Sequence, residues 1–103
     1  MIEEKIKDFF NLFEGKKIRC IFDVEKHKIY FSVLDLISSL KDNDIAYDYW
    51  KCLKYILEVE QNVIINNIVV FDLYNEKDEL EESELLDKDN ICKLIRFIKS
   101  ISK

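Results

Sequence analysis

The sequence predicts a small α+β domain in the order α-β-β-α-α-β-β-α, with two β-hairpins packed against helices. Three observations support this prediction. A chain of 103 residues suits one hydrophobic core. Apolar residues make up 49% of it and charged residues 36%, as in ordinary globular domains. The spacing of the apolar residues also switches between about 3.6, typical of helices, and two, typical of strands.

The first element is predicted to be a helix over residues 2–13. Its apolar residues recur at helical spacing, and they are Ile2, Ile6, Phe9, Phe10 and Phe13. Gly15, the only glycine in the chain, follows where a helix commonly ends in a residue with positive φ.

Residues 17–31 are predicted to form a β-hairpin, because apolar and polar residues alternate in KIRCIFD and a second short strand, HKIYF, follows. At Ser32 the period lengthens to that of a helix. Ser32 is expected to cap a helix over Val33–Leu40, with Asp35 completing a variant of the capping box.

A longer helix is predicted from about Ile45 to Val59, after the turn residues at 42–44. Trp50 lies on its apolar side, so this aromatic residue is expected to pack in the core. The expected buried face consists of Ala46, Tyr49, Trp50, Leu53, Ile56 and Leu57.

The second hairpin is predicted over Val63–Phe71, with its turn at Asn66-Asn67. An edge position would allow this hairpin to pair with another chain, so an oligomer is compatible with the sequence. Residues 76–89 are expected to form an acidic loop within a single domain spanning 1–103. The last helix is expected from near Asp89 or Asn90 to about Ser100, with its apolar face at Ile91, Leu94, Ile95 and Ile98.

The charge is unevenly distributed along the chain. The net charge is −5, which disfavours a generic nucleic-acid binder. Residues 76–89 contain eight acids and two lysines, so their net charge is −6 and that of the remainder is +1. The final stretch ICKLIRFIKSISK has basic residues and no acid. Its cations either form an ordinary solvated helix face or contact phosphates, and both interpretations stay open.

The sequence indicates no cofactor, metal site, membrane span or enzymatic activity. The cysteines Cys20, Cys52 and Cys92 lack metal-ligand spacing, so buried reduced thiols are expected. His27 is the only histidine and lies in a charged stretch, which disfavours a catalytic base. No apolar run is long enough to span a membrane, and residues 1–10 do not have the pattern of a signal peptide. The cytoplasm is therefore the expected compartment.

Several stretches together resemble the N-terminal domain of the BRO family (Bro-N), found in phage antirepressors and baculovirus repeated-ORF proteins. These stretches are the Ile18-Arg19 strand, YFSVLD at residues 30–35, YWKCLK at residues 49–54, and the closing LIRFIKSISK. The resemblance extends from about Phe10 to Lys103. It implies a DNA-binding regulatory module of a phage or prophage, without catalysis or a cofactor.

The cations that would then contact phosphates come from three parts of the chain. Their expected role is charge neutralisation and positioning, and no signature for reading bases is present. The candidates are Lys16, Lys17, Arg19, Lys51, Lys54, Lys93, Arg96 and Lys99.

A second hypothesis is that the chain binds another protein. Its acidic segment would present carboxylates to the basic groove of a host nucleic-acid-binding protein, such as a repressor, a restriction enzyme or a CRISPR effector, and inhibit it. The residues proposed for this contact are Glu76, Asp78, Glu79, Glu81, Glu82 and Glu84.

Overall fold

The computed structural model describes residues 6–13 and 15–101, which form an α+β domain. Its order is β-β-β-α-α-β-β-α, with one turn of 3-10 helix before the fourth strand. The strands are β1 (Ile6–Phe13), β2 (Lys16–Asp23), β3 (Lys28–Ser32), β4 (Val69–Tyr74) and β5 (Leu80–Asp87). The helices are α1 (Val33–Leu40), α2 (Asn43–Val59), the 3-10 helix η1 (Val63–Asn67) and α3 (Lys88–Ile101).

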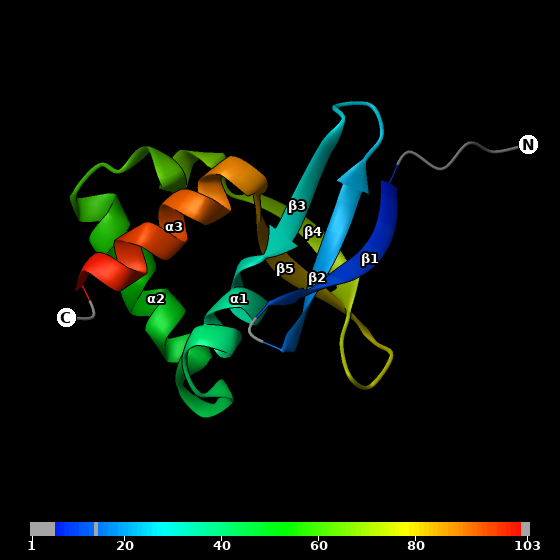
Figure 1. The fold of residues 1–103 in the computed structure, drawn as a ribbon, viewed down its shortest axis with the longest axis horizontal. Helices are drawn as coiled ribbons and strands as arrows, with labels where there is room; N and C mark the ends of the chain where they lie inside the picture. Colours follow the sequence, from blue (N-terminus) through cyan, green and yellow to red (C-terminus); the bar gives the residue numbers. More distant parts are fainter. Residues whose placement is uncertain (1–5, 14, 102–103) are drawn as a thin grey trace, which may run out of the picture.

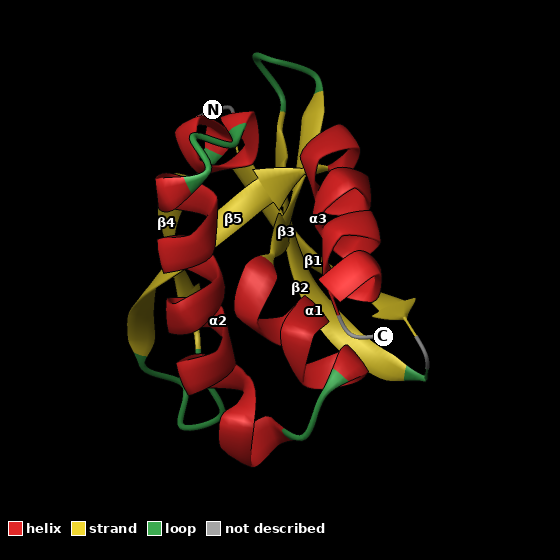
Figure 2. Cartoon of the chain, turned by 90° about the vertical axis from the view of Figure 1, so that its left-hand side faces the viewer, coloured by secondary structure: helices red, strands yellow, loops and turns green. Residues whose placement is uncertain are grey.

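The five strands make one antiparallel sheet in the order β1-β2-β3-β5-β4. The helices gather on one side of the molecule and the sheet on the other (Figure 1). Figure 2 shows α1, α2 and α3 side by side in front of the sheet, with α1 between the other two. The fold therefore has two layers, and β1 and β4 are the edge strands.

The main core lies between these two layers. Ile18 and Cys20 of β2 and Leu86 of β5 meet buried side chains from all three helices. Trp50 is 3% exposed and belongs to this cluster, so its predicted role as a core anchor is confirmed. The predicted apolar faces hold for α3 and for most of α2, whereas Ile56 is 37% exposed.

A smaller cluster lies on the other face of the sheet. It contains Ile21, Tyr30, Leu73 and Leu85. Leu85 and Leu86 are adjacent in β5 and both fully buried, yet they belong to different clusters, because successive side chains of a strand point to opposite faces.

Side chains cap the first and last helices at their N-termini. Ser32 Oγ accepts a hydrogen bond from the Asp35 N–H at 3.2 Å, which confirms the predicted cap of α1. In α3, Asp87 Oδ1 accepts from the Asn90 N–H at 3.0 Å and from Asn90 Nδ2 at 2.9 Å. Both caps come from the last residue of a strand, so each strand leads directly into its helix.

The predicted element order is wrong at the N-terminus. Residues 6–13 form β1, which pairs with β2 from Ile6 opposite Asp23 to Phe13 opposite Lys16, and residues 1–5 lie outside the described part. The spacing of the phenylalanines fits a helix, but the same residues favour strands, and pairing with β2 decides between the two. Gly15 has the expected positive φ, 75°, between two strands rather than at a helix end.

The predicted Val63–Phe71 hairpin is also wrong. Residues 63–67 form η1, where Asn62 Oδ1 accepts from the Ile64 N–H at 3.0 Å and Ile64 is buried. The local hydrogen bond and this burial outweigh the β-branched composition. The strand partner of β4 is β5, from Val69 opposite Leu85 to Tyr74 opposite Leu80.

The acidic segment is mostly a strand and not a loop. Only residues 75–79 form a turn, which Asn75 organises: its Oδ1 accepts from the Lys77 and Glu79 N–H groups at 2.9 and 3.1 Å. Residues 80–87 then form β5, because Ser83, Leu85 and Leu86 are buried in the sheet. The many acidic residues of this segment favoured a loop, so the sequence pattern did not predict the strand.

We expect Asp87→Ala to lower the free energy of unfolding by about 1 kcal/mol, since it removes the cap of α3. Asp87→Asn should retain most of the cap, because asparagine is also a good N-cap residue. Urea unfolding of the three proteins at neutral pH measures the difference. Equal losses in both variants would contradict capping as the cause.

The same residue should make stability depend on pH. Partial burial raises the pKa of Asp87, but the hydrogen bonds from Asn90 and Lys28 outweigh it, so this pKa lies below its ordinary value of 3.8. The stabilisation is present above that value and is lost as the pH falls through the lower, folded-state pKa. Asp87→Asn should show a smaller loss than wild type in urea titrations over this acidic range.

Candidate nucleic-acid and protein interfaces

The clearest basic surface lies on α3. Lys93, Arg96 and Lys99 are exposed at successive three-residue steps, each about 4.5 Å along the helix axis. Lys88 is also exposed at the start of the helix, between Asp87 and Asp89 in the sequence. No ion pair is found for these four cations among residues 6–13 and 15–101. We call Lys93, Arg96 and Lys99 the basic strip.

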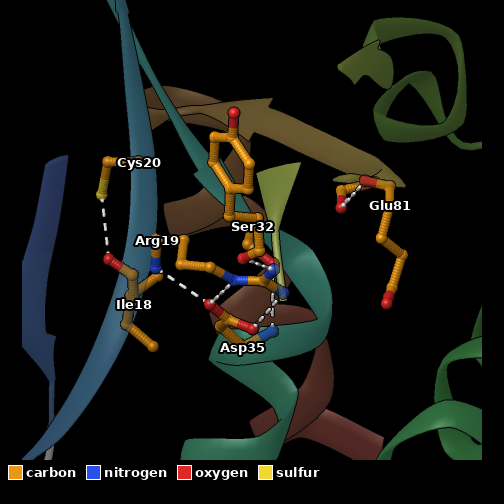
Figure 3. A network of polar contacts seen from close by, with 8 residues as sticks. Ile18, Arg19, Cys20, Ser32, Asp35 and Glu81 are labelled. Carbon is orange, nitrogen blue, oxygen red and sulfur yellow. Dashed lines mark hydrogen bonds and ion pairs between the residues drawn. The ribbon is translucent and has the colours of Figure 1, made fainter. Parts of the chain in front are cut away.

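Arg19 occupies a different position and has a structural role. Its Nε donates to Asp35 Oδ2 at 2.8 Å and its Nη2 to Asp35 Oδ1 at 2.9 Å, so the two side chains form a bidentate pair (Figure 3). The Arg19 backbone N–H also donates to Asp35 Oδ2 at 2.9 Å, and Nη1 donates to the Tyr74 carbonyl at 3.0 Å. Arg19 therefore joins β2, the first turn of α1 and the end of β4.

The hydrogen bond with Asp35 raises the pKa of Arg19 above its ordinary value, although burial acts in the opposite direction. The two side chains are 29% and 18% exposed. The guanidinium N–H groups of Arg19 are directed at the Asp35 carboxylate and the Tyr74 carbonyl. Arg19 is therefore poorly placed to contact a phosphate. Sequence reasoning identified Asp35 only as part of a cap and did not identify this pair.

Lys54 is similarly engaged. Its Nζ lies 2.9 Å from Glu84 Oε1, and the same oxygen accepts from Trp50 Nε1 at 3.0 Å. Lys54 also lies over the Trp50 ring, 5.7 Å from its centroid. Glu84 thus links α2 to β5. The sequence predicts Lys54 as a phosphate contact and Glu84 as a contact to a basic protein, but these two side chains bind each other.

A pocket of about 370 Å³ lies between α2 and the β4–β5 hairpin. Tyr47 and Trp50 line it from α2, and Glu82 and Glu84 from β5, with Arg19 also in its lining. Its two cations, Arg19 and Lys54, are both neutralised by carboxylates. The pocket therefore does not provide the positive potential that a phosphate group requires.

The remaining basic candidates are not brought together with the basic strip. Lys16 Nζ donates to the Ser38 carbonyl at 3.0 Å, and Lys17 follows it in β2. Lys51 Nζ lies over the Tyr47 ring, 5.1 Å from its centroid, on the flank of α2 that borders the pocket. Figure 2 shows α3 on the opposite side of α1 from α2. The predicted cations thus occupy separate surfaces.

The acidic candidates form a second, separate surface on the β4–β5 hairpin. Glu76, Asp78 and Glu79 are exposed in its turn, and Glu81 and Glu82 are exposed at the start of β5. The Glu81 carboxylate accepts from Asn75 Nδ2 at 3.1 Å. We call these five residues the acidic hairpin end; Glu84, paired with Lys54, is not part of it.

Residues 6–13 and 15–101 contain no group of three or more His, Cys, Asp or Glu side chains arranged to hold a metal ion. Cys20 is buried as expected, but Cys52 and Cys92 are exposed, so the expectation of buried thiols is wrong for these two. In this part of the chain, no helix combines the length and apolar character needed to cross a lipid bilayer.

Comparison of the chain with protein-family models, with curated proteins and with solved structures found no match. The resemblance to Bro-N therefore rests on the sequence stretches alone.

We expect Asp35→Ala to lower the free energy of unfolding by about 2 to 3 kcal/mol, because a half-buried guanidinium loses its carboxylate partner. Arg19→Lys should cost less, since the charge remains while the bidentate geometry is lost. Urea unfolding monitored by circular dichroism measures both. Lys26→Gln, in the exposed turn after β2, is the control and should change stability by less than about 0.5 kcal/mol. A loss in Asp35→Ala as small as that of the control would contradict a structural role for the pair.

Proposed function

We propose that the chain is a non-enzymatic DNA-binding regulatory module of the Bro-N type, acting as an antirepressor-like factor of a phage or prophage in the cytoplasm. The observation that carries the proposal is the basic strip on α3. Its cations are exposed, closely spaced and without ion-pair partners among the described residues, as phosphate contacts require.

The composition of α3 favours phosphate contacts over base reading. Side chains that read adenine are Asn and Gln, and the only one in α3 is Asn90, which is 7% exposed and bonded to Asp87. Arg96 and the exposed lysines could contact guanine, but no exposed amide side chain of α3 could read adenine. Binding with little sequence preference is therefore the expected mode, with the basic strip positioning the domain on the duplex.

The separation of charge favours one orientation on DNA. The acidic hairpin end is repelled by phosphates, while α3 is attracted. A chain with net charge −5 can therefore still approach a duplex with α3 leading. Such binding should be weak and strongly dependent on salt, since three cations neutralise few phosphates.

Fluorescence anisotropy with a labelled duplex across a salt series tests this proposal. If three phosphates are neutralised, the logarithm of affinity should fall with the logarithm of salt with a slope of about −2.7, and Lys93→Gln/Arg96→Gln should reduce the slope to about −0.9. Lys26→Gln/Lys77→Gln removes the same charge elsewhere and should leave the slope unchanged. Equal effects of the two double variants, or no binding of wild type at low salt, would refute the proposal.

A second candidate function is supported by the acidic hairpin end. Its five carboxylates project from a turn and the start of an ordered strand, and Tyr74 and Leu80 beside them are 56% and 59% exposed. Carboxylates around exposed apolar side chains suit the basic surface of another protein. We propose that this surface binds the nucleic-acid groove of a host repressor, restriction enzyme or CRISPR effector if the chain acts as an inhibitor.

Replacing Glu76, Glu79 and Glu82 with glutamine should abolish capture of such a partner in a pulldown while leaving the fold intact, because these side chains are exposed. Added duplex DNA should displace the partner from the wild-type chain, since both occupy the same groove. Undiminished capture by the triple variant, or capture insensitive to DNA, would count against this function.

A further inference from the structure

Helix α2 has a second apolar face that is turned away from the core. Its side chains are exposed: Ile45 49%, Tyr55 69%, Ile56 37% and Val59 65%. Val63 of η1, 58% exposed, follows the end of the helix. Cys52 is exposed between them. We call Ile45, Cys52, Tyr55, Ile56, Val59 and Val63 the outer stripe.

The spacing of the outer stripe is that of a helix-binding seam. Ile45, Cys52 and Val59 are seven residues apart, and Ile56 is four residues after Cys52. At 100° per residue these four side chains fall within a sector of about 60°, roughly opposite Trp50 and Leu57. From Ile45 to Val59 the stripe is about 21 Å long, which is four turns of helix.

The core of the protein is built from the other face of α2. Leu53 and Leu57 are 2% and 0% exposed on the inner side of α2, where they belong to the main cluster. A helix that packs on one side normally presents polar residues to solvent on the other. Scattered exposed apolar residues are ordinary, but several gathered along one face of a helix indicate an interaction surface.

The charges around the outer stripe indicate what binds it. Asp44, Asp48, Glu58 and Glu60 are exposed on α2 or directly after it, against one exposed lysine, Lys51, which gives a local net charge of 1 − 4 = −3. A partner with basic residues beside its apolar ones is complementary to this rim. A second copy fits poorly: an antiparallel pair of α2 helices centred on Cys52 would bring Asp44 against Glu60.

We propose that the outer stripe binds an amphipathic helix of another protein, with an apolar seam flanked by lysine or arginine. The seven-residue spacing suits a helix packed along α2 at a shallow angle. This surface is distinct from the basic strip and from the acidic hairpin end. It therefore gives a DNA-binding or inhibitory domain a separate means of attachment to a protein partner.

The exposed cysteines provide a matched test. In Cys92→Ser an environment-sensitive dye is attached to Cys52, inside the stripe; in Cys52→Ser it is attached to Cys92, on α3. The probe is a helical peptide of about 18 residues with leucine on one face and lysine on the other. The peptide should change the emission of the dye at Cys52 saturably and leave that at Cys92 unchanged.

Tyr55→Ser/Val59→Ser in the Cys92→Ser background should weaken binding by at least about tenfold, because both side chains are exposed anchors and their loss does not disturb the core. Glu79→Gln/Glu82→Gln should leave unchanged the affinity for the peptide that is measured with the dye at Cys52. This result would separate the outer stripe from the acidic hairpin end. A peptide of the same composition in scrambled order should bind much more weakly.

Three results would overturn the proposal: an equal response at Cys92, an unchanged affinity in Tyr55→Ser/Val59→Ser, or equal binding of the scrambled peptide. Sedimentation equilibrium of the unlabelled protein adds a fourth. A dimer that Tyr55→Ser/Val59→Ser dissociates would show that a second copy, and not a basic helix, occupies the stripe.

Discussion

The bidentate pair between Arg19 and Asp35 holds together parts of the fold that no strand ladder joins. In the sheet, β3 and β5 separate β2 from β4, yet Arg19 on β2 bonds the Tyr74 carbonyl at the end of β4. The same guanidinium fixes the first turn of α1 through Asp35, whose own N–H is held by Ser32. One arginine thus connects β2 both to the end of β4 and to the first turn of α1.

The basic strip and the acidic hairpin end lie on different elements of this scaffold, α3 and the β4–β5 hairpin. Where opposite charges do meet, as in Lys54 with Glu84 and Lys28 with Asp87, the pairs tie helices or strands to β5. In the part of the chain that the structure describes, neither the basic strip on α3 nor the acidic hairpin end has an ion-pair partner. The overall charge of −5 therefore describes neither surface, and each has to be considered with its own partner.

Sequence patterns predicted best where a local rule and the core agreed, and failed where long-range pairing decided. The cap at Ser32, the burial of Trp50 and the inner face of α3 follow from spacing and capping chemistry alone. The strand at residues 6–13 depends on pairing with β2, and β5 depends on burial of Leu85 and Leu86 inside an acidic stretch. Neither the partner of Arg19 nor that of Lys54 could be read from the sequence, since each lies far along the chain.

The position of β4 at the edge of the sheet has a consequence for how the molecule behaves in a crowded solution. An edge strand with valine, phenylalanine and tyrosine offers unpaired backbone groups to any other extended chain. Asp72 is exposed in the middle of β4, where a further strand would have to dock, and it lies opposite Glu82 of β5. A charged side chain on an edge strand disfavours pairing with a further strand, so Asp72 opposes the recruitment of other copies at β4.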